Sequence, residues 1–167
     1  MPKTDGIRWK DGSIDGVTLR PLQCHADQRG WLAEMFRRDE MAAELMPAMG
    51  YVSATRPGIS RGPHSHAEQT DCFACACAGD FELKFWDARP GSRTYGHRLS
   101  IAAGESNPMM IVIPPGVVHG YKNVSGKDGI ILNFPNRLYA GDGRKGPVDE
   151  VRYEQQGAAA SFSMEDE

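Results

Sequence analysis

Two histidines one residue apart, in the stretch "SRGPHSHAEQTD" over residues 60–71, carry the strongest chemical signal in the sequence. His64 and His66 follow Arg61 and precede Gln69 and Asp71. In an extended strand, side chains two residues apart point to the same face, so the two imidazoles project together. Imidazole exchanges a proton near neutral pH and also binds transition metals. The stretch therefore predicts either a proton-transfer site or a metal site.

A third histidine follows a rigid turn in "PPGVVHGYKN", residues 114–123. The two prolines end an apolar strand, the glycine permits a turn, and the next strand begins before His119. If both stretches belong to one small β barrel, His64, His66 and His119 can face its cavity together. At this point Asp71 can be a metal ligand, a base or an ordinary acid at the end of a strand.

Short apolar or alternating runs separated by Gly and Pro form the framework that must position these residues. Runs of this kind at about ten-residue spacing predict an all-β sandwich or barrel. The predicted strands lie within residues 16–22, 30–37, 50–56, 71–78, 80–88, 95–102, 108–114, 116–124 and 129–135.

Two local features refine this framework. The run "DEMAAELM" (39–46) begins with Asp, contains good helix formers and is followed by Pro47, so it predicts one short helix. Gly79-Asp80 lies between two apolar runs and predicts a tight hairpin that pairs the strand at 71–78 with the strand at 80–88.

Cysteines alternate with Ala and Phe along 72–77, which is typical of a strand interior rather than a zinc site.

The bulk properties limit the classes of partner. The 167 residues predict a single domain over 1–141 and a partly flexible C-terminal extension over 142–167. A net charge of −3 gives no broad basic surface for nucleic acid. No window reaches the roughly 18 apolar residues of a membrane helix, and the first residues lack a signal-peptide core. We expect a cytoplasmic protein without membrane or nucleic-acid partners.

Several short motifs resemble those of known families. The two histidine stretches resemble the paired motifs of the cupin superfamily, which implies a double-stranded β-helix, or jelly roll. Over a longer range the sequence resembles the dTDP-4-dehydrorhamnose 3,5-epimerase family of cupins. The stretches that carry this resemblance, in family order, are "DQRGWLAE" (27–34), "SRGPHSH" (60–66), "WDAR" with "SRTYG" (86–96), "IPPGVVHGY" (113–121) and "RLYAG" (137–141).

The resemblance implies an isomerase that moves a proton next to the carbonyl of a nucleotide-linked keto-sugar. It implies His64 as the general base and Tyr139 as the acid that returns a proton from the opposite face. The implied reaction needs no cofactor. We also expect a homodimer, because small domains of this kind often complete their sheets with a partner's strand. The residues implied in substrate binding are Arg29 and Arg61 at the diphosphate, with Glu34 and His119 at the sugar.

Three departures from the family pattern change the expected chemistry. The family's lysine, which stabilises the developing enolate, falls at Asp71, and His66 is an additional histidine beside the base. The distal aspartate that orients the catalytic histidine has only Asp149 as a substitute. The candidate catalytic set therefore includes His66 and Asp71 beside His64 and Tyr139.

Other activities fit these departures. A 3,4-ketoisomerase of dTDP-sugars would use His64 and His66 to shuttle a proton without metal. A metal-dependent isomerase or dioxygenase would bind one divalent Fe, Mn, Ni or Zn ion through His64, His66 and His119 with Gln69 or Asp71. A non-catalytic cupin would only bind a sugar.

Overall fold

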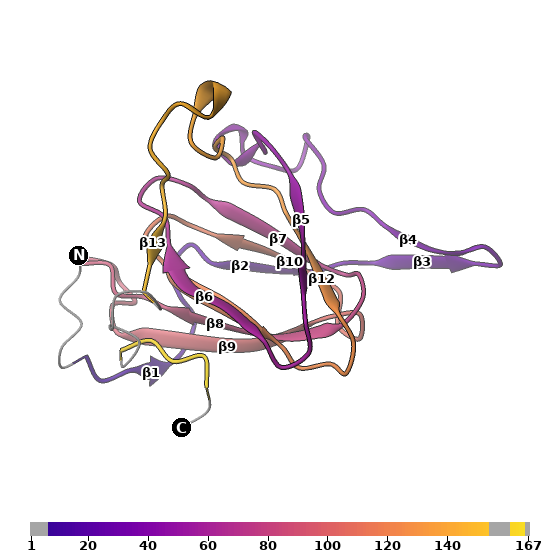
Figure 1. The fold of residues 1–167 in the computed structure, drawn as a ribbon, viewed down its shortest axis with the longest axis horizontal. Coiled ribbons are helices and arrows are strands. Elements are labelled where there is room, and N and C mark those ends of the chain that lie inside the picture. The colour runs from indigo at the N-terminus through magenta and orange to yellow at the C-terminus, as the bar shows by residue number, and fades with distance from the viewer. Residues whose placement is uncertain (1–6, 154–160, 166–167) are drawn as a thin grey trace.

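Two facing β-sheets form a jelly roll in the computed structural model, which describes residues 7–153 and 161–165 (Figure 1). The predicted all-β cupin fold is thereby confirmed. The six-stranded sheet has the order β1 (Lys10–Asp11), β9 (His97–Gly104), β8 (Asp80–Trp86), β11 (Val118–Asn123), β6 (Ser60–Ser65) and β13 (Val151–Arg152). The five-stranded sheet has the order β2 (Thr18–Pro21), β10 (Met109–Ile113), β7 (Asp71–Cys75), β12 (Gly129–Asn133) and β5 (Tyr51–Thr55).

Alternating apolar side chains fill the space between the two sheets. Along β8, Phe81, Leu83 and Phe85 point into this core, where they meet residues such as Ile111 and Ile131 from the facing sheet. This two-residue period is what a strand with one buried face produces. Burial of such side chains is the main force that holds the two sheets together.

Segments outside the sheets cover both outer faces. Phe162 and Met164 pack on the six-stranded sheet against Trp86 and Tyr153, while Phe36 and neighbouring residues pack on the five-stranded sheet. The described parts of the predicted extension, 142–153 and 161–165, thus contact the body of the protein. Residues 154–160 and 166–167 lie outside the described residues, and the boundary at 141 stays a prediction.

A two-stranded hairpin projects from the body, built from β3 (Cys24–Asp27) and β4 (Gly30–Ala33) (Figure 1). Trp31 and Leu32 on it are 54% and 62% exposed. An isolated two-stranded hairpin is marginally stable in water, so this one presents an apolar surface that no other described residue of the chain covers.

Two local predictions were wrong. Over 39–46 the chain forms turns and a 3₁₀ helix, η1 (Ala43–Leu45), instead of an α-helix; a second 3₁₀ helix, η2, spans Asp142–Arg144. None of the residues of η1 is buried, and a segment of about two turns is too short for a stable α-helix on its own. None of the helical segments in residues 7–153 and 161–165 has the length and apolar content needed to cross a membrane.

The predicted hairpin at Gly79-Asp80 is also absent, because this turn carries the chain from one sheet to the other. β7 pairs with β10 and β12, whereas β8 pairs with β9 and β11. Every residue of β7 is buried, as expected for a strand in the middle of a sheet that is covered on both faces. The prediction of strand-interior cysteines is confirmed for Cys72 and Cys75, which are free and buried, whereas Cys77 lies beyond the end of β7 and is half-buried.

Asp87, just after β8, is the centre of a buried hydrogen-bond cluster. Its carboxylate accepts bonds from the Arg89 guanidinium at 2.8 and 2.9 Å and from the hydroxyls of Ser92 and Thr94 at 2.6 Å. Burial raises its pKa, but these hydrogen bonds outweigh that effect and leave the pKa well below its ordinary value. The stabilisation is therefore present at neutral pH and is lost as the pH falls through the folded-state pKa.

We expect Asp87→Asn to lower the free energy of unfolding by about 2–3 kcal/mol at neutral pH, because charged hydrogen bonds are lost in a buried place. Urea denaturation measures this difference, which should shrink in strong acid. Asp128→Asn, at an exposed position, is the control. Equal midpoints for the two variants would refute this role of Asp87.

Candidate functional site

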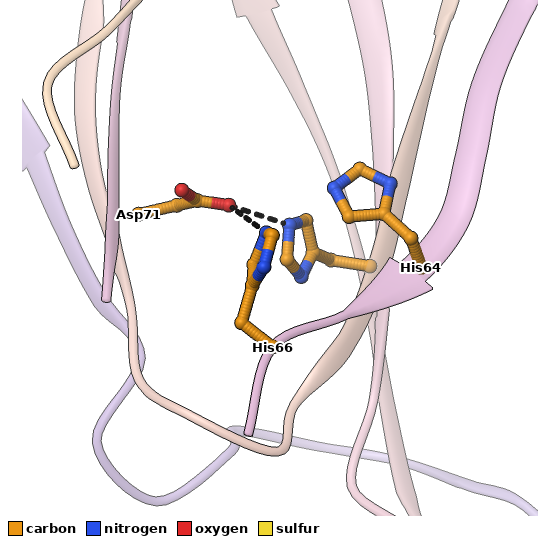
Figure 2. A group of neighbouring side chains, drawn as sticks. His64, His66 and Asp71 are labelled. Atoms are coloured by element: carbon orange, nitrogen blue, oxygen red, sulfur yellow. Dashed lines mark hydrogen bonds and ion pairs between the residues drawn. The ribbon is translucent and has the colours of Figure 1, made fainter. Parts of the chain in front are cut away.

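The three predicted histidines lie close together beside Asp71. Figure 2 shows two of them, His64 and His66, with the Asp71 side chain. His64 on β6 is the direct strand partner of His119 on β11, so both side chains lie on the same face. Their ring centroids are 4.4 Å apart, and those of His64 and His66 are 5.4 Å apart. The prediction that the histidines come together across distant segments is confirmed.

A bulge in β6 sets the direction of His64. Arg61 is opposite Tyr121 and His64 is opposite His119, so β6 holds one more residue than β11 over this interval. Gly62 lies within the bulge with φ +86°, and a Cβ there would lie 2.8 Å from the carbonyl oxygen of His119. Only glycine fits this conformation and this close approach.

Asp71, the first residue of β7, is 1% exposed and accepts hydrogen bonds at both carboxylate oxygens. Oδ2 lies 3.1 Å from Nε2 of His66 and 3.1 Å from Nε2 of His119. Oδ1 accepts from the side-chain amides of Gln69 at 2.8 Å and Asn133 at 2.9 Å. The carboxylate thus joins residues from both sheets, and Figure 2 shows it directed at the imidazoles.

This network moves the pKa values of neighbouring groups in opposite directions. Burial alone would raise the pKa of Asp71, but hydrogen bonds from His119 and His66 hold it well below its ordinary value. Burial opposes the charged form of His66, but the hydrogen bond and charge of Asp71 outweigh it and raise its pKa. For His64, loss of water and then the nearby His119 and His66 lower the pKa well below its ordinary value. His64 is consequently a neutral base beside a charged cluster.

A cavity of about 1270 Å³ opens beside the cluster. Of the predicted residues, those on its wall are Arg61, His64, His66, Gln69, Tyr139 and Asp149. Tyr139 is 54% exposed on the loop after β12. The cavity is large enough for a small organic ligand with a diphosphate.

Other predicted residues lie elsewhere in the single chain. His119 is buried behind the wall and contacts Asp71. Arg29 is on the projecting hairpin and pairs with Asp27. Glu34 follows the hairpin and pairs with Arg37. Neither Arg29 nor Glu34 is among the residues that line the cavity.

Asp149 was expected to orient His64, whereas the structure places it in contact with His66. Its main-chain carbonyl contacts Nδ1 of His66. The sequence did not indicate this role, nor the role of Asn133 as a donor to Asp71. An inward-facing asparagine in the apolar run "GIILN" was the one available signal, because a buried amide requires a partner.

The histidine cluster also has the composition of a metal site. One possible ligand atom from each of His64, His66, Asp71 and His119 lies within 4.8 Å of every other. Two or three imidazoles and one carboxylate suit a divalent transition ion. Gln69, the other proposed ligand, is engaged with Asp71. The same side chains therefore fit a metal site or an acid–base site by geometry alone.

Comparison with known proteins identifies the family. The family model described as dTDP-4-dehydrorhamnose 3,5-epimerase matches residues 11–146. The chain belongs to this family. The probable low-salt glycan biosynthesis epimerase Agl13 of Haloferax volcanii is 39% identical over 128 residues, which are 76% of this chain and 81% of the relative. Family membership makes the chain a sugar-nucleotide epimerase and an enzyme, and favours this activity over a metal-dependent one.

Solved structures support the same fold. A dTDP sugar isomerase from Desulfovibrio desulfuricans G20 superposes with a TM-score of 0.77 at 21% identity and covers 91% of both chains. ChmJ, a 3'-monoepimerase from Streptomyces bikiniensis in complex with dTDP-quinovose, has a TM-score of 0.74 at 19% identity, over 93% of this chain and 80% of that chain. The epimerase family therefore shares this jelly roll.

We expect Asp71→Asn to lower the free energy of unfolding by about 3 kcal/mol, because it leaves buried imidazoles without their counter-charge. Asp71 contributes at neutral pH and loses its effect as the pH falls, whereas the His66 contribution is present below its ordinary pKa and is lost as the pH rises through its raised value. The difference from the native chain should thus be largest in mildly acidic buffer.

Chemical denaturation over a series of pH values measures this effect. Glu68→Gln, which removes an exposed ion pair with Arg137, should change stability by less than about 1 kcal/mol. A difference for Asp71→Asn that is as small as this control, or that does not vary with pH, would contradict the charged cluster.

Proposed function

We propose that the chain inverts a carbon next to the ketone of a nucleotide-linked 4-keto-6-deoxy sugar, with His64 as the base and Tyr139 as the acid. The observation that carries the proposal is the position of His64 on the wall of a large cavity, where its burial and then the neighbouring His119 and His66 lower its pKa well below the ordinary value. A base that stays unprotonated at neutral pH can remove the proton made acidic by the neighbouring carbonyl. No cofactor takes part in these proton transfers.

Arg61 is suited to bind the diphosphate. Its guanidinium donates to the Thr55 hydroxyl at 3.0 Å and to the Ala54 carbonyl at 2.9 Å, so the side chain is held in position at the cavity wall. A guanidinium forms strong, directional bonds to phosphate oxygens. The ChmJ structure contains dTDP-quinovose, and by analogy we propose a dTDP-sugar for this chain.

Positive charge at the cluster would replace the family's lysine. Asp71 alone would oppose the negative charge of an enolate, but His66 beside it has a raised pKa and lines the cavity. A protonated His66 therefore supplies the compensating charge. His66 and Asp71 act together in this proposal, and the buried His119 helps to hold Asp71 in position.

We further propose a homodimer in which the hairpin of one copy covers the partner. Trp31 and Leu32 on the hairpin are exposed, and so are Tyr51 and Val52 on β5, the edge strand of the five-stranded sheet. Because Tyr51 also lines the cavity, a hairpin packed there would bring Arg29 to the partner's cavity, and Glu34 follows it closely. Association would cover an apolar hairpin and an open sheet edge together.

The location proposed from the sequence, the cytoplasm, agrees with the four free cysteines, because disulfides are rare in that compartment.

Incubation of the enzyme with a dTDP-4-keto-6-deoxyhexose in deuterium oxide tests the reaction. We expect deuterium to enter next to the carbonyl, and His64→Asn to slow this exchange at least about 100-fold by removing the base. Tyr139→Phe should still admit deuterium but form less inverted product, because His64 can return a proton only to its own side. Mass spectrometry measures the deuterium incorporated into the sugar, and proton NMR gives the configuration of the product.

His97→Asn is the control, because His97 contacts the Ser13 carbonyl and does not line the cavity. Sugar binding without exchange would indicate a non-catalytic protein. Full activity of His64→Asn would exclude His64 as the base.

Mixing two variants, each assayed at a substrate concentration at which neither is active alone, tests the dimer. Arg29→Ala should weaken substrate binding, whereas Arg93→Ala, which removes a similarly exposed arginine paired with Asp15, should not. After subunit exchange, an equal mixture of Arg29→Ala and His64→Asn chains should recover about a quarter of native activity, since half of the dimers contain one intact cavity. A monomeric enzyme, or exchange of subunits without recovery, would contradict the arrangement.

A 3,4-ketoisomerase is the second candidate, favoured by one observation. The rings of His64 and His66 are 5.4 Å apart and both line the cavity, so a proton could move between neighbouring carbons on one side of the sugar. Carbon NMR of the product distinguishes the two reactions, because an epimerase leaves the ketone where it was and a ketoisomerase moves it.

A further inference from the structure

Tyr51, the first residue of β5, lies on the cavity wall and has no part in the proton transfers proposed above. Side chains two residues apart on a strand point to the same face, so Tyr51, Ser53 and Thr55 form a row of hydroxyl groups. Thr55 accepts a hydrogen bond from Arg61 at 3.0 Å, and Tyr51 and Ser53 line the cavity. The row therefore leads from the proposed diphosphate site to the end of β5 that pairs with Asn133.

The side chain of Asn133 determines how the Tyr51 hydroxyl can bond. Its oxygen accepts the main-chain N–H of Cys72 at 3.0 Å, and because that N–H can only donate, the amide has one orientation. The N–H₂ group then donates one hydrogen to Asp71 Oδ1 and the other to the hydroxyl oxygen of Tyr51, each at 2.9 Å. The tyrosine oxygen is thus an acceptor in this bond.

The hydroxyl hydrogen of Tyr51 is left to bond elsewhere. A phenol keeps its hydrogen at neutral pH and can donate it while its oxygen accepts. Within residues 7–153 and 161–165, no group accepts this hydrogen. Tyr51 is 47% exposed on the cavity wall, so the hydrogen is available to a bound ligand. The bond from Asn133 also makes the hydroxyl a better donor, because linked hydrogen bonds polarise one another.

The position of this donor indicates which part of a ligand it would meet. Asn133 contacts both Tyr51 and Asp71, so the hydroxyl lies on the side of the cavity where Asp71 contacts His66. Arg61 is held at the other end of the β5 row by Thr55. A nucleotide-linked sugar whose diphosphate lies at Arg61 would therefore extend its hexose along the row towards Tyr51.

We propose that Tyr51 is a substrate-binding residue that donates its hydroxyl hydrogen to an oxygen on carbon 2, 3 or 4 of the hexose. For the identity of the ligand, a nucleotide-linked sugar, this inference rests on the proposed function. It adds a contact to the sugar itself, whereas Arg61 contacts the diphosphate.

Isothermal titration calorimetry with dTDP and with dTDP-quinovose tests this contact, because only the second ligand carries a hexose. Tyr51→Phe removes the hydroxyl alone. We expect it to weaken binding of dTDP-quinovose about tenfold, as for one lost hydrogen bond, and binding of dTDP less than about twofold. Tyr95→Phe is the matched control, because Tyr95 is 46% exposed and does not line the cavity. It should change neither affinity.

Analogues of dTDP-quinovose that each lack one hydroxyl, at carbon 2, 3 or 4, distinguish a direct contact from an indirect effect through Asn133. One analogue lacks the accepting oxygen, so Tyr51→Phe should bind it as tightly as the native enzyme does. The other two should bind more weakly to Tyr51→Phe than to the native enzyme.

Several results would overturn the proposal. These are equal weakening of dTDP and dTDP-quinovose, unchanged affinity for dTDP-quinovose, and equal weakening of all three analogues. Loss of a native dimer in Tyr51→Phe, measured by sedimentation, would also overturn it, because the hydroxyl would then bond to the partner's hairpin.

Binding and turnover separate this inference from the proposed reaction. A native enzyme that binds dTDP-quinovose but exchanges no deuterium into a keto-sugar would refute the reaction, and the affinities of Tyr51→Phe would still decide the contact. A native enzyme that binds neither dTDP nor dTDP-quinovose would overturn both.

Discussion

The buried carboxylate of Asp71 is the interaction on which the rest of the site depends. It stands at the start of a strand in one sheet and accepts hydrogen bonds from His66 and His119, which belong to segments of the other sheet. An ionised carboxylate with 1% exposure is stable only when donors and positive charge surround it. The two sheets are therefore joined at the active end of the jelly roll by charge, in addition to the apolar core.

That constraint explains why two neighbouring histidines have different chemistry. His66 faces Asp71 and its pKa is raised, whereas His64 lies beside the cluster without a carboxylate partner among the described residues and its pKa is lowered. Like-signed neighbours and loss of water lower the pKa of a base, and an acidic partner raises the pKa of a donor. In the proposed reaction, a carboxylate in the lysine position of the family thus fits epimerase chemistry by acting through His66.

Much of the framework was predictable because the relevant signals are local. Period-two runs and Gly/Pro turns gave nine strands, and the histidine spacing gave the core of the site. Besides the short helix predicted at 39–46, strand pairing failed: the turn at Gly79 suggested a hairpin, while the path of β7 between β10 and β12 depends on contacts far apart in sequence. For the same reason Asp149 was assigned to His64 when it contacts His66. In the proposed dimer, the place of Arg29 relative to the cavity depends on a second chain.

A crystal structure of the enzyme with a dTDP-4-keto-6-deoxyhexose tests the central claim most directly. The account predicts that the hydrogen next to the ketone faces the His64 ring, with its carbon about 3–3.5 Å from a ring nitrogen. It also predicts the ketone oxygen on the side of His66. A sugar whose acidic hydrogen faces away from His64, or whose ketone is bound by a metal ion among the histidines and Asp71, would contradict it.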